Sequence, residues 1–221
     1  MKKFVIILAL WSSVFVCDVV SQEFMPDPHR FDKEISLFKN WDEKNSFPDS
    51  AVLFVGSSSI RMWKTQRYFP GLKVINRGFG GSHISDVIFF FTDIVKKYNP
   101  VKIVFYAGDN DIAAGKTPQR VVADFKHFVK MVADSIGNID LIYIPIKPSL
   151  NRWKYWELMN KANLMIKKFI DNNENLYYAD IVKPMLNANG FPKEEIFIED
   201  GLHLNSNGYR LWTSVLNKFL R

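Results

Sequence analysis

The chain has 221 residues, of which 48% are hydrophobic and 24% charged, and its formal net charge is +6 at pH 7. This size and composition indicate one globular domain with a sizeable core. The longest basic cluster is a pair of lysines, as at Lys96 and Lys97. We therefore expect no nucleic-acid partner.

The first 21 residues have the pattern of a signal peptide. Lys2 and Lys3 precede a short apolar run, and Val19 and Ser21 fit the small residues of a cleavage site. The apolar run is too short and too interrupted for a stable membrane span. We expect export to a bacterial periplasm or secretion, with one mature domain over residues 22–221.

Cys17, the one cysteine of the chain, lies within this leader, so no intramolecular disulfide can form. It stands where the lipid-bearing cysteine of a lipoprotein would stand, but Val16 replaces the small residue expected before it. Lipid anchoring through Cys17 is therefore the weaker alternative to cleavage after Ser21.

Residues 22–50 are expected to form a helical lead-in. Four apolar side chains in this stretch recur with helical spacing on one face: Phe31, Ile35, Phe38 and Trp41. The continuous apolar run at 51–55 follows and predicts a strand buried on both faces. It leads directly into Gly56 and the three hydroxyls of Ser57, Ser58 and Ser59.

Four more strands are expected along the rest of the chain, at 72–76, 101–107, 139–144 and 176–181. Helical patterns separate them, the longest opening with Thr117 as N-cap and Pro118 in the first turn. The others begin near Ile84, Trp153 and Ser206. This alternation of strand and helix predicts a single α/β domain with a parallel sheet covered by helices on both faces.

Polar, glycine-bearing loops follow the first three strands, beginning at Gly56, Gly78 and Gly108. Each loop alone is ordinary turn chemistry. Because the carboxyl ends of parallel strands meet at one edge of the sheet, the three loops together predict a ligand site there.

A serine nucleophile needs a base, and the base needs an orienting group. Among the four histidines, His203 is the best placed, because Asp200 precedes it by three residues across a glycine. That spacing lets the carboxylate reach Nδ1 and leaves Nε2 free to take a serine proton. His83 also follows a glycine loop, but no carboxylate stands in an obvious supporting position.

Other ligand motifs fit less well. His83 occupies the last glycine position of a dinucleotide-binding G-x-G-x-x-G, no phosphate-binding G-x-x-x-x-G-K-[ST] is present, and Ile60 replaces the second glycine of a G-x-S-x-G elbow. A metal site on Asp109, Asp111, Asp200 and His203 is the weaker alternative, because Asp-Asn-Asp on a turn is typical of Asx capping.

These blocks, in this order, resemble those of the SGNH (GDSL-like) hydrolases, and most closely the platelet-activating-factor acetylhydrolase-like esterases. The resemblance covers nearly the whole mature chain. It implies a three-layer α/β/α fold with a five-stranded parallel sheet, that is, a flavodoxin-like SGNH hydrolase fold.

The resemblance also implies roles for individual residues. Ser58 matches the nucleophile, Asp200 and His203 complete the triad, and the oxyanion hole comprises Ser58, Gly81 and Asn110. No metal or organic cofactor is implied. One departure is visible: Ser57 replaces the family's aspartate. A serine hydroxyl can make a similar local hydrogen bond in the turn, so the change bears on the rigidity of the turn more than on the chemistry.

The implied activity is that of a serine esterase acting on short acyl esters, most simply acetyl groups on carbohydrate. His83, Lys147, Arg152 and Trp153 are candidates for lining the substrate site, although a Pro-ended loop with a core tryptophan explains the last three equally well. Two alternatives stay open: a lysophospholipase or thioesterase-type acylhydrolase, and a glycan-binding module that keeps the fold without turnover.

Overall fold

The computed structural model describes residues 26–220. The expected leader, its cleavage site and Cys17 lie outside these residues. No helix within the described part of the chain is long and apolar enough to cross a membrane.

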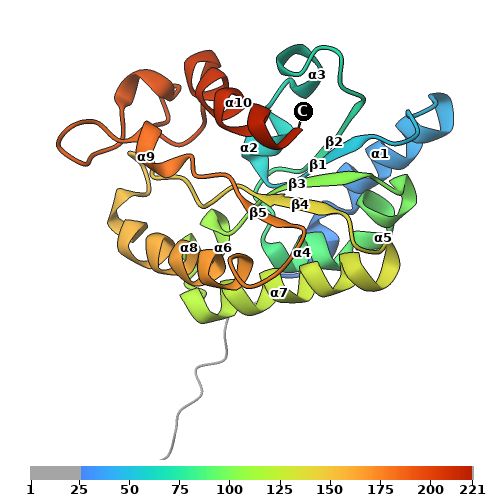
Figure 1. The fold of residues 1–221 in the computed structure, drawn as a ribbon, viewed down its shortest axis with the longest axis horizontal. Helices are drawn as coiled ribbons and strands as arrows, with labels where there is room; N and C mark the ends of the chain where they lie inside the picture. Colours follow the sequence, from blue (N-terminus) through green and yellow to red (C-terminus); the bar gives the residue numbers. More distant parts are fainter. Residues whose placement is uncertain (1–25, 221) are drawn as a thin grey trace, which may run out of the picture.

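A five-stranded parallel sheet forms the centre of the fold, with the strand order β2-β1-β3-β4-β5 (Figure 1). The fold class predicted from the sequence is confirmed. The strands are β1 (Val52–Gly56), β2 (Val74–Gly78), β3 (Lys102–Tyr106), β4 (Asp140–Tyr143) and β5 (Leu176–Tyr178).

Helices cover both faces of this sheet (Figure 1). One layer contains η1 (Pro28–Phe31), α1 (Asp32–Lys44), α4 (Ile84–Phe89), α5 (Phe91–Ile94), α7 (Pro118–Ser135) and α8 (Trp156–Ile170). The opposite layer contains α2 (Ser58–Arg61), α3 (Thr65–Tyr68), α9 (Val182–Met185), η4 (Glu194–Ile196) and α10 (Ser206–Leu220). Three short elements complete the chain: η2 (Lys96–Tyr98), α6 (Asp109–Ala113) and η3 (Trp153–Tyr155).

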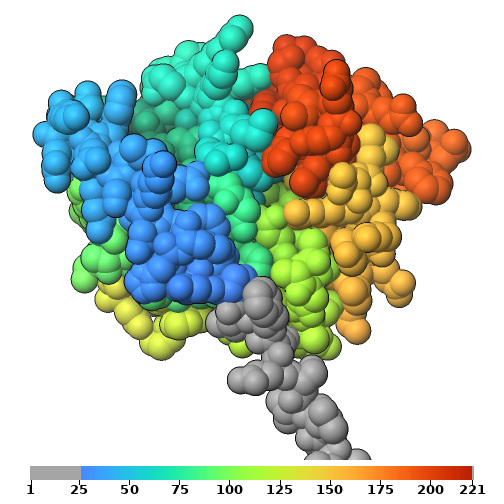
Figure 2. All heavy atoms as spheres, turned by 180° about the vertical axis from the view of Figure 1, so that it is seen from behind, coloured from blue at the N-terminus to red at the C-terminus, as the bar shows by residue number. Residues whose placement is uncertain are grey.

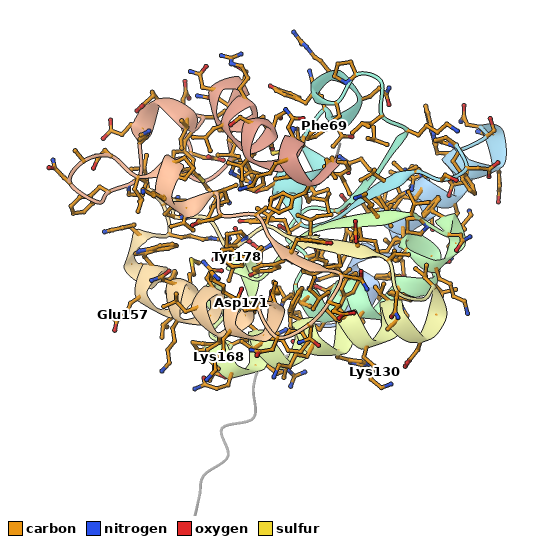
Figure 3. The ribbon with its side chains drawn as sticks, in the orientation of Figure 1. Phe69, Lys130, Glu157, Lys168, Asp171 and Tyr178 are labelled. Carbon is orange, nitrogen blue, oxygen red and sulfur yellow. The ribbon has the colours of Figure 1, made fainter. Side chains whose placement is uncertain are left out.

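The strand β1 is buried on both faces, as its continuous apolar run predicts. Leu53 and Val55 face the core under α4 and α7, whereas Val52 and Phe54 face the core under α10. Period-two alternation explains this division, because successive side chains of a strand point to opposite faces. The stick view shows the same contrast between inside and outside: Phe69 lies within the fold near α10, and Lys130, Glu157 and Lys168 point outward from their helices (Figure 3).

The strand register places the functional loops at one level. Gly56 pairs with Gly78 of β2 and with Tyr106 of β3. The carboxyl ends of these three strands are therefore aligned, and the loops that follow them emerge side by side.

The strand boundaries differ modestly from the expected ones. The second strand begins at Val74 rather than at residue 72, because pairing with Val52 sets where the ladder starts. The fifth strand ends at Tyr178 and not at residue 181, and it pairs with β4 alone.

One prediction for the lead-in helix is wrong. Trp41 was expected on the buried face, but it is 63% exposed. At about 100° per residue, position 42 and not 41 continues the face of Phe31 and Ile35. The Asp42 carboxylate occupies that place and pairs with Arg77 at 2.5 Å.

Candidate active site

The turn after β1 presents Ser58 at the sheet edge. Gly56 has φ +137°, and a Cβ there would lie 1.8 Å from the carbonyl oxygen of Tyr106, so only glycine fits. The N–H of Ser57 donates to that same carbonyl at 2.9 Å. Ser58 then opens the short helix α2.

Ser58 meets His203, which lies 145 residues further along the chain. The Oγ of Ser58 lies 2.9 Å from Nε2 of His203, and Nδ1 of the same ring lies 2.6 Å from Oδ2 of Asp200. Because the carboxylate only accepts, the assignment that fits places the proton on Nδ1. Nε2 is then the acceptor that faces the serine hydroxyl.

Asp200 is held by its own loop. Its Oδ1 accepts the backbone N–H groups of Leu202 and His203, each at 2.8 Å. Burial alone would raise the pKa of Asp200, but the hydrogen bond from the His203 ring and those from the two N–H groups outweigh it and hold the pKa below its ordinary value. The carboxylate therefore stays ionised and fixes the ring.

The neighbouring serines do not share this arrangement. Ser57 and Ser59 are buried, and neither Oγ has a hydrogen-bond partner within residues 26–220. The Ser57 hydroxyl therefore does not make the local hydrogen bond that a serine could make in this turn, and the contact of Ser57 with the turn comes from its backbone N–H.

The backbone N–H groups of Ser58 and Gly81 and the side chain of Asn110 belong to the loops that follow β1, β2 and β3. Gly81 is exposed and has φ +78°, with open space where a Cβ would be. Within the described residues, neither its N–H nor that of Ser58 has a hydrogen-bond acceptor. The Asn110 amide reaches the same loop, because its Nδ2 donates to the carbonyl of Ser82 at 3.0 Å.

The segment after β4 connects the two halves of the site. Arg152 Nη2 donates to Oδ1 of Asn110 at 2.9 Å. The N–H of Asn151 donates to the carbonyl of Gly201 at 3.0 Å, and its side chain reaches the carbonyl of Asp200 at 3.2 Å. This segment therefore touches both the Asn110 loop and the Asp200 loop.

The four residues proposed to line the substrate site lie at different depths. The Lys147 side chain is 1% exposed, and its Nζ lies 3.2 Å from Oδ2 of Asp109 and 3.0 Å from the Tyr106 hydroxyl. The His83 ring is also buried, ahead of α4, and its Nδ1 has no partner among the described residues. These two side chains are buried beneath the surface and do not lie at the opening of the proposed substrate site.

Arg152 and Trp153 lie nearer to solvent. The Trp153 ring stacks on Trp156 with centroids 5.8 Å apart and an interplanar angle of 11°. It also meets Phe191 at 5.2 Å, and Phe191 is 53% exposed. We call these three side chains the aromatic ledge.

Two sets of contacts near the site were not predicted from the sequence. Asp109 pairs with Lys147 and Arg152, which lie a full strand-and-helix unit away in the chain. On the other side, Glu34 Oε1 accepts the N–H of Gly80 at 3.3 Å and pairs with Arg61 at 3.1 Å. In the sequence these are isolated charged residues, and nothing in their local spacing identifies their partners.

Within residues 26–220, no three histidine, cysteine, aspartate or glutamate side chains are grouped so as to hold a metal ion. A serine hydroxyl facing a histidine that faces a carboxylate is the arrangement of nucleophilic hydrolases.

Comparison with known families agrees with this class. The sequence model of the GDSL-like Lipase/Acylhydrolase family matches residues 58–211, more than half of the chain. The chain belongs to this family, whose members hydrolyse esters. None of the curated proteins compared with the chain matches its sequence.

Solved structures share the fold at low sequence identity. A candidate platelet activating factor from Streptococcus pneumonia is 18% identical with a TM-score of 0.77, over 86% of this chain and 92% of that one. A GDSL-like lipase from Bacteroides thetaiotaomicron is 17% identical with a TM-score of 0.70, over 88% and 97%. A carbohydrate esterase family 3 protein from Talaromyces cellulolyticus is 16% identical with a TM-score of 0.61, over 77% and 95%.

Proposed function

We propose that this protein is a serine esterase that removes short acyl groups, most simply acetyl, from carbohydrate. The observation that carries the proposal is the continuous line of hydrogen bonds from Ser58 through His203 to Asp200. Export is part of the same proposal and rests on the leader pattern of residues 1–21 alone.

The first half of the reaction forms an acyl-enzyme. Ser58 Oγ attacks the ester carbonyl while Nε2 of His203 takes the hydroxyl proton. The tetrahedral intermediate collapses, the bond to the leaving alcohol breaks, and His203 returns the proton to that alcohol. In the second half a water molecule repeats the sequence and releases the carboxylic acid and free Ser58.

Negative charge develops on the carbonyl oxygen in both halves. The N–H groups of Ser58 and Gly81 and the Nδ2 of Asn110 are the proposed donors to it. A donor of this kind is typically worth about 10²–10³-fold in rate. Neither backbone N–H group has an acceptor within residues 26–220, which supports the assignment.

The aromatic ledge supports carbohydrate as the carrier of the acyl group. Aromatic faces suit the apolar side of a sugar ring, and Trp153 directly follows Arg152, whose guanidinium contacts Asn110. One structural neighbour is a carbohydrate esterase.

The test of the nucleophile uses three matched variants and p-nitrophenyl acetate. Ser58→Ala should lose at least about 10³-fold in kcat, because triad members act together. Ser57→Ala and Ser59→Ala should keep most of their activity, since neither hydroxyl bonds to anything in the described chain. Full activity in Ser58→Ala, with loss in one of the other two, would refute the assignment.

The substrate class is tested separately with an acyl-chain series and a panel of acetylated polysaccharides. We expect activity to fall as the acyl chain lengthens and acetate to be released from at least one polysaccharide. Activity that rises toward long acyl chains would instead favour a lysophospholipase or thioesterase. Glycan binding without hydrolysis by wild-type protein would favour a binding module.

A further inference from the structure

The Asn110 side chain is anchored at both ends of its amide. Its Oδ1 accepts from Arg152 Nη2 at 2.9 Å, and its Nδ2 donates to the carbonyl of Ser82 at 3.0 Å. An amide nitrogen carries two hydrogens, so one remains after the bond to Ser82. Because the guanidinium only donates, it fixes Oδ1 on its own side and prevents the amide from turning over.

Arg152 is itself braced by a buried carboxylate. Its Nη1 lies 3.1 Å from Oδ2 of Asp109, a side chain that is only 5% exposed. The other oxygen of Asp109 accepts the backbone N–H of Asn110 at 2.9 Å. One carboxylate therefore holds both the backbone of Asn110 and the cation that orients its side chain.

Oδ2 of Asp109, the oxygen that faces Arg152, also lies 3.2 Å from Nζ of Lys147. Burial acts to raise the pKa of Asp109, but the charges of Lys147 and Arg152 outweigh it and keep the pKa below its ordinary value. The Asp109 carboxylate thus lies between two basic side chains, those of Lys147 and Arg152. The guanidinium of Arg152 places its positive charge beside Oδ1 of Asn110.

We propose that Arg152, braced by Asp109, is a positioning residue that locks the Asn110 amide in the orientation that donates to the oxyanion and adds positive charge next to it. This inference rests on the proposed esterase function and goes beyond it by assigning a role to a residue outside the triad and the three oxyanion donors. Arg152 acts through Asn110 and not as a direct contact to the sugar.

An Arg152→Met variant tests the role, because methionine keeps an unbranched apolar stem and removes the guanidinium with its donor to Asn110 and its charge. We expect kcat on p-nitrophenyl acetate to fall by about tenfold or more, short of the roughly 10²–10³-fold typical of losing a donor itself, while KM changes little. Arg152→Lys should recover part of the loss. Lys154→Met is the control, since this exposed cation contacts only the Tyr155 ring among the described residues.

A double-mutant cycle with Asn110→Ala identifies the path of the effect. If Arg152 acts through Asn110, then Arg152→Met should slow the Asn110→Ala enzyme far less than it slows the wild type. Fully additive losses, or an unchanged kcat in Arg152→Met, would overturn the proposal. Should Arg152→Met not fold, Arg152→Lys enters the same cycle with the same two outcomes.

Ser58→Ala in the same assay separates the two proposals. Retained activity in that variant contradicts the esterase mechanism, whatever Arg152 does. An NMR readout of the Asn110 side-chain amide, assigned by its disappearance in Asn110→Ala, needs no activity. Its hydrogens should exchange faster with water in Arg152→Met than in Lys154→Met, and equal exchange in the two variants contradicts the locking role.

Discussion

Three consecutive serines carry the same hydroxyl group but have different surroundings. Ser58 faces His203 at 2.9 Å, whereas the hydroxyls of Ser57 and Ser59 are buried without partners in the described chain. The sequence could not rank them by physical argument, since all three follow the same strand. Their ranking came from a family resemblance, and the contact with a histidine 145 positions away now supplies the physical reason.

His83 is a buried histidine that the proposed mechanism does not use. Burial lowers its pKa to about 4 from an ordinary 6.5, and the charges of Lys116 and Arg30 act in the same direction. The backbone N–H of His83, not its ring, donates to Oδ2 of Asp86 at 2.7 Å ahead of α4. The folded state therefore resists protonation of this ring more than the unfolded chain does.

A pH series should isolate this effect. A depressed pKa gives stability that is fully present above pH 6.5 and is lost as the pH falls toward 4. Relative to a His83→Asn variant, the wild type should lose up to about 3 kcal/mol of unfolding free energy over that interval. The difference between the two proteins, measured by urea unfolding at several pH values, checks this.

The comparison with His83→Asn is needed because Asp111 changes the unfolding free energy with pH in the direction opposite to His83. Burial raises the pKa of Asp111 to about 6, despite the neighbouring Lys116. Its contribution is therefore present below pH 3.8 and is lost as the pH rises through 6. Both proteins contain Asp111, so a difference that does not change with pH would contradict the account of His83.

The lead-in segment η1–α1 acts as a brace for the glycine loop. It packs across the edge of the domain against the segment that contains β1, α2 and β2 (Figure 2). Arg30 pairs with Asp86 at 2.5 Å, and Glu34 accepts the N–H of Gly80 next to Gly81. The loop that offers a proposed oxyanion donor is thus held from outside the sheet.

A pair of substitutions on α1 tests which face of the helix is buried. Ile35 is 2% exposed, and Ile35→Ala should cost about 2–5 kcal/mol of unfolding free energy through the cavity it leaves. Leu37 is 59% exposed, so Leu37→Ala should stay within about 0.5 kcal/mol of wild type. Equal effects in denaturant unfolding would contradict the orientation of α1.

The elements were predictable where a period or a continuous apolar run marked them. The run at 51–55 and the N-cap at Thr117 lie where they were expected, and Thr117 accepts the N–H of Arg120 at 3.2 Å. The failure at Trp41 shows the limit of the helical pattern. An aspartate with a distant cationic partner took the buried position that the pattern assigned to an aromatic ring.

At the scale of the whole molecule, the register of the strands brings residues that are far apart in the sequence into one site. The level ends of β1, β2 and β3 bring the Ser58, Gly81 and Asn110 loops together, and the segment after β4 reaches both Asn110 and the Asp200 loop. The spacing of Asp200 and His203 could be seen in the sequence because their contact is local. The Asp109–Lys147–Arg152 cluster could not, because only tertiary packing pairs these residues.

The most direct test of the central claim is covalent labelling of wild-type protein with a fluorophosphonate, followed by tandem mass spectrometry of the peptide that ends at Arg61. We predict one adduct per chain, on Ser58, with no labelling of Ser58→Ala and slower labelling of His203→Ala. An adduct on Ser57 or Ser59, or a folded wild-type protein that takes no label, would contradict the account.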